Sequence, residues 1–210
     1  MNFQEQQWAN EFGNEYIERN FLNTAQEQEY FETTFGISRQ ALNEKFLGDL
    51  PKDIKILEVG CNIGIQLQVL QEMGFTNLFG IDINRKSIEI AKKTRKNIDI
   101  IEGSALDIPF KDSFFDLVFT SGVLIHIAPE NIKNALSEII RCSNKYIWGL
   151  EYFAPEHIDV NYRGNENLLW KGNFVKMYQE TSPGLELVKE EKLKYPASDN
   201  TDTMFLLKKI

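Results

Sequence analysis

Cysteine is scarce in this sequence, with only Cys61 and Cys142 among 210 residues. Two isolated cysteines are too few for a disulfide framework and lack the spacing of a zinc site, so we expect free, buried thiols and no bound metal. Long apolar runs are also missing, since none approaches the roughly 20 residues that span a bilayer. The first residues have neither the basic start nor the apolar core of a signal peptide. We therefore expect a cytoplasmic protein that does not enter a membrane.

Basic residues are in deficit, because 23 Lys and Arg face 31 Asp and Glu, for a formal net charge of −8. No cluster of Lys and Arg interrupts this acidity. A negative field repels phosphate backbones, so the charge argues against a nucleic-acid partner and favours a small-molecule one. A chain of this length buries well over half of its unfolded surface, and one structural domain therefore needs no covalent staples.

Short apolar runs alternate with helical stretches from Lys52 onward. The runs predict strands over residues 54–59, 78–82, 98–102, 115–120, 146–152, 185–193 and 203–207. Helical periodicity predicts helices over residues 63–73, 85–95, from Pro129 onward and over 168–180. Such alternation implies an α/β fold, a Rossmann-like doubly wound and mostly parallel sheet with helices on both faces. Its ligands bind where the strands end.

The first 50 residues differ in composition, being rich in Gln, Glu and Asn with interleaved aromatics. Trp8, Phe12 and Tyr16 recur every four residues, which predicts one helix that carries them on one face. A second helix is predicted from about Ser38 to Leu47. We expect residues 1–50 to form an N-terminal helical cap on a domain of residues 51–210.

A glycine loop follows the first predicted strand, in the run Glu58-Val-Gly60-Cys-Asn62-Ile-Gly64. Glycine permits a sharp turn and close approach of a ligand, and the following helix offers free N–H groups to an anionic group. The dinucleotide fingerprint Gly-x-Gly-x-x-Gly is not met, because Asn62 and Ile65 stand where it needs glycine. Alone, the loop is also consistent with an ordinary strand-to-helix turn.

Asp82 ends the next predicted strand, about 20 residues after the glycine loop. One strand–helix–strand unit of this length brings an acid beside the ribose of a bound nucleoside. The acid can then accept hydrogen bonds from the ribose hydroxyls. The alternative role is capping of the following helix, for which Asn84 is the better placed residue.

Small residues end the third and fourth predicted strands. Ser104 and Ala105 would let backbone N–H groups reach an adenine edge, with Leu106 packed on the ring. Ser121 ends the fourth strand, and the loop after it carries His126. His126 is a candidate base or pocket residue, although histidines in such places more often serve as structural hydrogen-bond partners.

In this order and spacing, the four motifs resemble those of the class I S-adenosylmethionine-dependent methyltransferases over roughly residues 52–152. The resemblance implies that the chain is such an enzyme and that S-adenosyl-L-methionine is its cofactor. By this resemblance the residues that bind the methionine part are Glu58, Gly60, Asn62 and Gly64. Asp82 would hold the ribose, with Ile83 beside it.

The resemblance further assigns the adenine to Ser104, Ala105 and Leu106, and we add Ser121 to the expected cofactor-binding set. The sequence departs from the common pattern at Asn62, where glycine is frequent, and at Ser104, where aspartate is frequent. The second departure argues against a side-chain contact from this position to the adenine amino group, but not against a backbone contact.

The flanking segments resemble a narrower group, the methylases associated with pseudaminic acid biosynthesis. The similarity lies in residues 8–20, with Trp8 and the run Glu11-Phe-Gly-Asn-Glu-Tyr16, and in residues 162–174. It implies a bacterial surface-sugar pathway. Tyr16 and Arg19 lie three residues apart on one helical face, and their segment is expected to fold over the cofactor. Either Arg19 or Tyr16 is expected to meet the methionine carboxylate, with an exposed ion pair as the alternative for Arg19.

Methyl transfer from a sulfonium needs alignment, exclusion of water and, for a weak nucleophile, removal of a proton. A base is expected at the carboxyl end of a strand. Glu151 and Tyr152 are the first candidates, followed by His126 and His157.

Three other functions stay open at this point. The acceptor can be a peptide or another macromolecule instead of an amino sugar, a sugar nucleotide or a similar metabolite. The chain can bind the cofactor without catalysis, or it can be an oxidoreductase. The sequence does not specify the methylated atom or the oligomeric state.

Overall fold

Three parallel strands form the sheet of the first half of the chain in the computed structural model, which describes residues 1–20 and 23–210. The strands are β1 (Lys55–Val59), β2 (Asn77–Asp82) and β3 (Asp99–Glu102), in the order β3-β2-β1. Val59 pairs with Ile81, and Asp82 pairs with Glu102. The carboxyl ends of the three strands therefore meet at one edge, as expected for ligand-binding α/β sheets.

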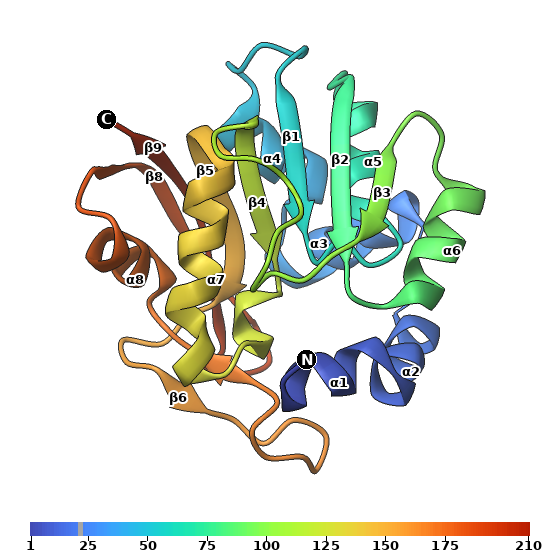
Figure 1. The fold of residues 1–210 in the computed structure, drawn as a ribbon, viewed down its shortest axis with the longest axis vertical. Coiled ribbons are helices and arrows are strands. Elements are labelled where there is room, and N and C mark those ends of the chain that lie inside the picture. The colour runs from blue at the N-terminus through green and yellow to red at the C-terminus, as the bar shows by residue number, and fades with distance from the viewer. Residues whose placement is uncertain (21–22) are drawn as a thin grey trace. The chain divides into compact units, whose positions relative to one another are not determined.

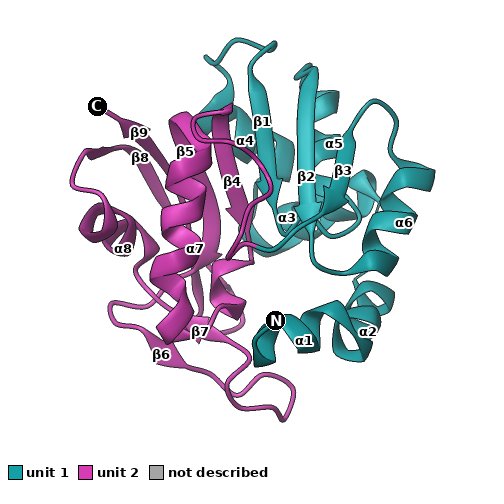
Figure 2. Cartoon of the chain, viewed as in Figure 1, with its two compact units in different colours: residues 1–104 teal, residues 105–210 magenta. Residues whose placement is uncertain are grey.

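The chain divides into two compact units, Met1–Ser104 and Ala105–Ile210 (Figure 2). The first unit holds the three parallel strands and the glycine loop. The helices of this unit are α1 (Phe3–Ala9), α2 (Glu11–Arg19), α3 (Thr24–Phe35), α4 (Arg39–Leu47), α5 (Ile65–Glu72) and α6 (Arg85–Thr94).

Side-chain caps explain where four of these helices begin. The residues that cap them with a side-chain oxygen are Asn2, Asn23, Ser38 and Asn84. Asn2 and Asn23 both form capping boxes, in which the side chains of Glu5 and Gln26 accept from the backbone amide of the cap residue. The helix predicted from Ser38 is thus confirmed as α4, and Asn84 has the capping role that the sequence indicated.

The single N-terminal helix predicted from Trp8, Phe12 and Tyr16 is wrong. Asn10 has a non-helical backbone, with φ −117° and ψ −141°, so α1 ends before it and α2 begins after it. The aromatic pattern arises instead from packing across the bend. The Trp8 ring lies 5.1 Å from Phe12 and 5.3 Å from Tyr16 between centroids, edge-on in both cases.

The second unit combines a parallel pair with an antiparallel extension. Its elements are β4 (Phe115–Ser121), η1 (Leu124–His126), α7 (Pro129–Cys142), β5 (Ser143–Tyr152), β6 (Ile158–Asp159), β7 (Trp170–Lys171), α8 (Phe174–Thr181), β8 (Leu185–Lys194) and β9 (Thr201–Lys209). β4 pairs parallel with β5, and β9 pairs antiparallel with both β5 and β8. A small second sheet pairs β6 with β7.

All seven predicted strands are present, and their ends lie within three residues of the predicted ones. The helix predicted over residues 168–180 is shorter than expected, because Trp170 and Lys171 pair with β6. Asn173 then caps α8 by accepting from the Lys176 amide. Both cysteines are free and buried, as predicted. Among the described residues, no helix combines the length and the apolar character needed to cross a membrane.

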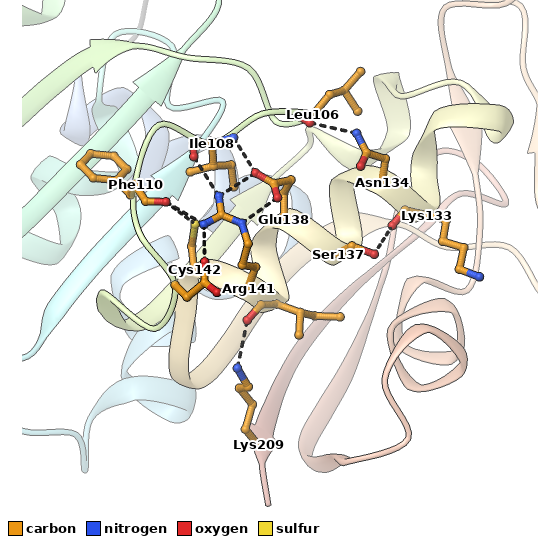
Figure 3. Close-up of polar contacts among 12 residues, drawn as sticks. Leu106, Ile108, Phe110, Lys133, Asn134, Ser137, Glu138, Arg141, Cys142 and Lys209 are labelled. Carbon is orange, nitrogen blue, oxygen red and sulfur yellow. Dashed lines mark hydrogen bonds and ion pairs between the residues drawn. The ribbon is translucent and has the colours of Figure 1, made fainter.

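Arg141 fastens the loop before β4 to helix α7 (Figure 3). Its guanidinium donates to the carbonyls of Ile108 and Phe110 at 2.9 and 2.7 Å and pairs with Glu138 at 2.7 Å. Glu138 in turn accepts from the Ile108 amide, and the hydrogen bond from Arg141 lowers the pKa of Glu138. Asn134 donates to the Leu106 carbonyl at 2.9 Å. The chain that follows Ala105 is therefore held by polar contacts to one helix face.

Candidate functional site

The glycine loop after β1 turns through three residues with positive φ. Gly60, Asn62 and Gly64 have φ values of 72°, 49° and 74°. Asn is among the few side chains that adopt this region readily, which accounts for Asn62 at a position where glycine is frequent. A Cβ on Gly64 would lie 2.9 Å from Ile100 Cδ1, so a larger residue would have to displace the end of that side chain as well as adopt the positive φ. The loop opens directly into α5, whose first residues have no side-chain cap.

Asp82 joins this loop to the start of α6. Its Oδ2 accepts from the Asn62 amide at 2.7 Å, and its Oδ1 accepts from the Asn84 amide at 2.8 Å and from the Ser87 hydroxyl at 3.1 Å. Burial raises the pKa of Asp82, while these donors oppose the rise by favouring the carboxylate. The acid predicted for the ribose thus has a second task, which is to fix the glycine loop against the next strand.

Two buried oxygen atoms beside the loop lack a hydrogen-bond partner among the described residues. They are Glu58 Oε2, on a side chain that is 3% exposed, and Asn62 Oδ1. Burial raises the pKa of Glu58 well above its usual range, and the positive charge of Arg39 opposes this rise. Unpaired buried acceptors are costly unless a donor occupies them. A ligand that offers an ammonium group or hydroxyl groups as donors fits these two acceptors.

Helices α1 and α2 lie on the side of the first unit where β2 ends and α6 begins (Figure 1). The Asn84 side-chain amide donates to the Trp8 carbonyl at 3.0 Å and to Asn14 Oδ1 at 3.1 Å. Lys86 pairs with Glu18 at 2.7 Å. The N-terminal helices are therefore fastened to the residues that follow Asp82.

Tyr16 and Arg19 stand on α2 as the sequence indicated, and their role toward the cofactor stays a prediction. The Tyr16 ring packs on Trp8. Arg19 pairs with Glu15 at 3.2 Å, and its guanidinium lies 6.0 Å from the centre of the Phe12 ring. Arg19 thus forms an ion pair within α2 in this structure.

Ser104 lies at the exit of β3, where the adenine was expected. The Gly103 amide donates to the Asp82 carbonyl at 3.0 Å, so this exit runs beside Asp82. The Ser104 hydroxyl donates to Glu5 Oε1 at 2.5 Å. Glu5 was not among the predicted site residues. The sequence signals its helix start through Asn2 and Glu5 three residues apart, but nothing in it links Glu5 to a residue 99 positions away.

Glu151, the first candidate base, lies at the end of β5 in the second unit and is 2% exposed. Both of its oxygens accept from the Val123 amide, at 3.1 and 3.0 Å. Burial raises the pKa of Glu151 to about 7, with these bonds acting against the rise. The carboxyl therefore holds the start of η1, and close to neutral pH it exchanges a proton.

His126 sits on η1, three residues after Val123. Its Nδ1 lies 2.7 Å from the Leu168 carbonyl, and a carbonyl can only accept, so Nδ1 carries hydrogen and Nε2 is the basic nitrogen. Burial lowers the pKa of His126 to about 4. The ring is therefore neutral at pH 7. Its centre lies 5.4 Å from that of Tyr162.

Tyr152 follows Glu151 as the last residue of β5. Its ring packs edge-on against Tyr195 at 5.9 Å, and Lys171 lies 5.6 Å from the ring centre. His157, the last candidate, lies between Trp170 and Phe174, at 6.5 and 6.4 Å between ring centres. Glu151 and His126 thus share one turn, whereas Tyr152 and His157 belong to the region around β7.

The remaining predicted residues of the second unit lie at its start and at the end of β4. Ala105 and Leu106 begin the unit, and Ser121 ends β4 opposite Leu150. Ile83, in the first unit, lies between Asp82 and Asn84, and its amide favours the Asp82 carboxylate. No three His, Cys, Asp or Glu side chains in the described part of the chain are arranged to hold a metal ion.

Residues 57–145 match the methyltransferase domain family. The match begins just before the glycine loop and ends within β5. The matched segment covers less than half of the chain. It includes Asp82, Ser104 and His126, whereas α1 to α4 and everything after residue 145 lie outside it.

Curated relatives that this chain matches in part are methyltransferases named for different acceptors. One is the tRNA (carboxymethyluridine(34)-5-O)-methyltransferase alkbh8 of Xenopus tropicalis, 30% identical over 50% of this chain and 17% of the relative. Another is the ubiquinone/menaquinone biosynthesis C-methyltransferase UbiE of Campylobacter jejuni, 28% identical over 46% of this chain and 43% of the relative. The matches span less than half of either relative.

Solved structures extend the likeness in fold beyond the matched segment. The PH0226 protein of Pyrococcus horikoshii superposes with a TM-score of 0.68 at 18% identity, over 93% of this chain and 99% of that one. The 1,6-didemethyltoxoflavin-N1-methyltransferase of Burkholderia thailandensis, solved with S-adenosylhomocysteine, has a TM-score of 0.63 at 12% identity, over 81% and 76% of the two chains. The predicted fold class, Rossmann-like and mostly parallel, is confirmed. The predictions of a methyltransferase and of S-adenosylmethionine as its cofactor agree with the family match.

Proposed function

We propose that this chain is an S-adenosylmethionine-dependent methyltransferase that acts on a small molecule. The observation that carries the proposal is the arrangement around Asp82. One carboxylate fixes the glycine loop and the next helix start, and two buried acceptors, Glu58 Oε2 and Asn62 Oδ1, await donors beside it. A nucleoside with ribose hydroxyls and a methionine ammonium supplies such donors.

In this proposal Glu58, Gly60, Asn62 and Gly64 hold the methionine part, and Asp82 holds the ribose. When bound, the cofactor supplies a methyl group on a positively charged sulfur. The work left to the protein is to orient the acceptor, exclude water and take up a proton. Tyr16 and Arg19 are proposed to cover the methionine end from α2.

Two groups of the second unit are suited to take up the acceptor's proton. Glu151 has a pKa of about 7, so its carboxyl can accept a proton near neutral pH, although both oxygens also hold Val123. His126 is neutral at pH 7, so its Nε2 carries no proton, but the lowered pKa of about 4 makes it the weaker base of the two. Tyr152 completes the proposed set as a residue that shapes the acceptor site.

The acceptor that we propose is an amino sugar or sugar nucleotide of bacterial surface-glycan biosynthesis. Support comes from residues 8–20 and 162–174, which resemble the pseudaminic acid-associated methylases. The structurally similar 1,6-didemethyltoxoflavin-N1-methyltransferase was solved with a small molecule, 1,6-didemethyltoxoflavin, bound. We further propose a cytoplasmic protein in which residues 1–50 cap a domain of residues 51–210.

A macromolecular acceptor is the second candidate, because one relative is a tRNA methyltransferase. The net charge of −8 disfavours RNA and leaves a peptide as the stronger form of this alternative. Supplying S-adenosylmethionine with a labelled methyl group to fractions of metabolites, peptides and RNA distinguishes them. Label in the metabolite fraction supports the proposal, and label confined to peptides or RNA contradicts it.

Cofactor binding is tested by calorimetric titration of the wild-type chain with S-adenosylhomocysteine and with NAD. We expect binding of the first alone. The Asp82→Asn variant places an NH2 donor against the amide of either Asn62 or Asn84, removes the negative charge, and should weaken binding by about tenfold or more. Asp99→Asn is the matched control, because Asp99 is exposed at the start of β3. Preferential binding of NAD would support an oxidoreductase instead.

A further inference from the structure

Glu5 places a carboxylate at the exit of β3 from a helix that is distant in sequence. Its Oε1 accepts from the Ser104 hydroxyl at 2.5 Å, and its Oε2 accepts from the Asn2 amide at 2.8 Å. The Glu5 side chain is 18% exposed. The Met1 ammonium also lies 3.9 Å from Oε2, so Oε1 is the oxygen that retains a lone pair for a further donor.

The position of this carboxylate is set by the neighbouring strands. Ser104 follows Glu102 by two residues, and Glu102 pairs with Asp82. The Gly103 amide between them donates to the Asp82 carbonyl. Glu5 therefore lies next to the exit of β3, which neighbours Asp82, the acid proposed to bind the ribose.

We propose that Glu5 binds the cofactor by accepting a hydrogen bond from the exocyclic amino group of adenine. This inference rests on the proposed function. The amino group is a donor, and a carboxylate is a stronger acceptor for it than a serine hydroxyl. Ser104 donates its only hydrogen to Glu5 and so orients the carboxylate. Glu5 thereby supplies, from α1, the side-chain acceptor that Ser104 itself lacks.

The docking of α1 does not depend on Glu5 alone. Asn84 holds the Trp8 carbonyl and Asn14, and Lys86 pairs with Glu18. Substitution of Glu5 therefore leaves these fastenings in place. Because adenine would contact α1, ligand binding and the docking of α1 must strengthen each other reciprocally.

A pair of nucleosides tests the contact. S-adenosylhomocysteine carries the amino group, and S-inosylhomocysteine carries a carbonyl oxygen there. The wild-type chain should prefer the first by about tenfold or more, because an oxygen facing a carboxylate loses a charge-assisted hydrogen bond. In Glu5→Gln the amide can either accept or donate, so this preference should collapse. Glu11→Gln, the same change at an exposed residue of α2, should retain it.

A second variant separates the loss of the Glu5 carboxylate from the loss of the helix cap that Glu5 also supports. Glu5→Ala combined with Ser104→Asp restores a carboxylate at the strand exit and should regain the preference for S-adenosylhomocysteine that Glu5→Ala lacks. Hydrogen exchange in residues 3–19 should also slow on binding in the wild-type chain.

An unchanged preference in Glu5→Gln, or an equal loss of affinity for both nucleosides, overturns the role of Glu5. Failure of the wild-type chain to bind either nucleoside overturns the proposed function as well. The two failures are therefore distinguishable.

Discussion

Glu151→Gln should change how stability depends on pH. Burial raises the pKa of Glu151 from an ordinary value of 4.5 to about 7. Between these values the folded protein keeps a proton that the unfolded chain releases, so rising pH favours unfolding. A difference of about 2.5 pKa units corresponds to roughly 3 kcal/mol. The wild-type chain should therefore lose about 3 kcal/mol relative to the variant between about pH 4.5 and pH 7.

Urea unfolding followed by the fluorescence of the three tryptophans measures this difference. Comparison with the variant is essential because His126 acts in the opposite sense. The pKa of His126 is lowered from 6.5 to about 4. Its contribution to the free energy of unfolding is therefore complete above pH 6.5 and is lost as the pH falls through 4. Glu156→Gln, at an exposed residue in the loop after β5, is the matched control and should parallel the wild type. Parallel curves for wild type and Glu151→Gln would refute a raised pKa at Glu151.

Substitutions at three other residues test local geometry. Gly13→Ala would put a Cβ 1.9 Å from the Trp8 carbonyl oxygen, so it should loosen α1 despite the better helix propensity of alanine, seen as faster proteolysis of the N-terminal segment. Arg141→Gln removes bonds to the Phe110 carbonyl and its neighbours and should cost about 2–4 kcal/mol in urea unfolding; a loss below half of that would mean that the loop holds itself. Asn62→Ala should cost about 1 kcal/mol through its positive φ, whereas Asn62→Gly should be close to neutral.

The sequence predicted the parts of the fold that local chemistry determines. Pro129 occupies the first turn of α7, and Asn84 caps α6, as their residue types favour. Gly60 and Gly64 take the positive φ values that only a few residues tolerate. The strands follow from apolar runs bounded by turn residues.

The sequence failed where contacts between distant residues decide. The bend at Asn10 interrupts a pattern of period four, because the aromatics pack across it instead of along one helix. Helix α8 begins later than predicted because Trp170 pairs in a strand with Asp159, 11 residues earlier in the chain. The contact between Glu5 and Ser104 has no local signature. Sequence reasoning predicts a ribose contact for Asp82, which stays a prediction, and it did not reveal that Asp82 accepts from the Asn62 amide.

Backbone amide chemical shifts during titration with S-adenosylhomocysteine test most directly whether the Asp82 edge of the first unit binds the nucleoside. We expect the amides of Asn62, Asn84 and Gly103 to shift first and most, because they surround the Asp82 carboxylate and the exit of β3. Saturable shifts confined to other residues, with these three unchanged, would contradict the account.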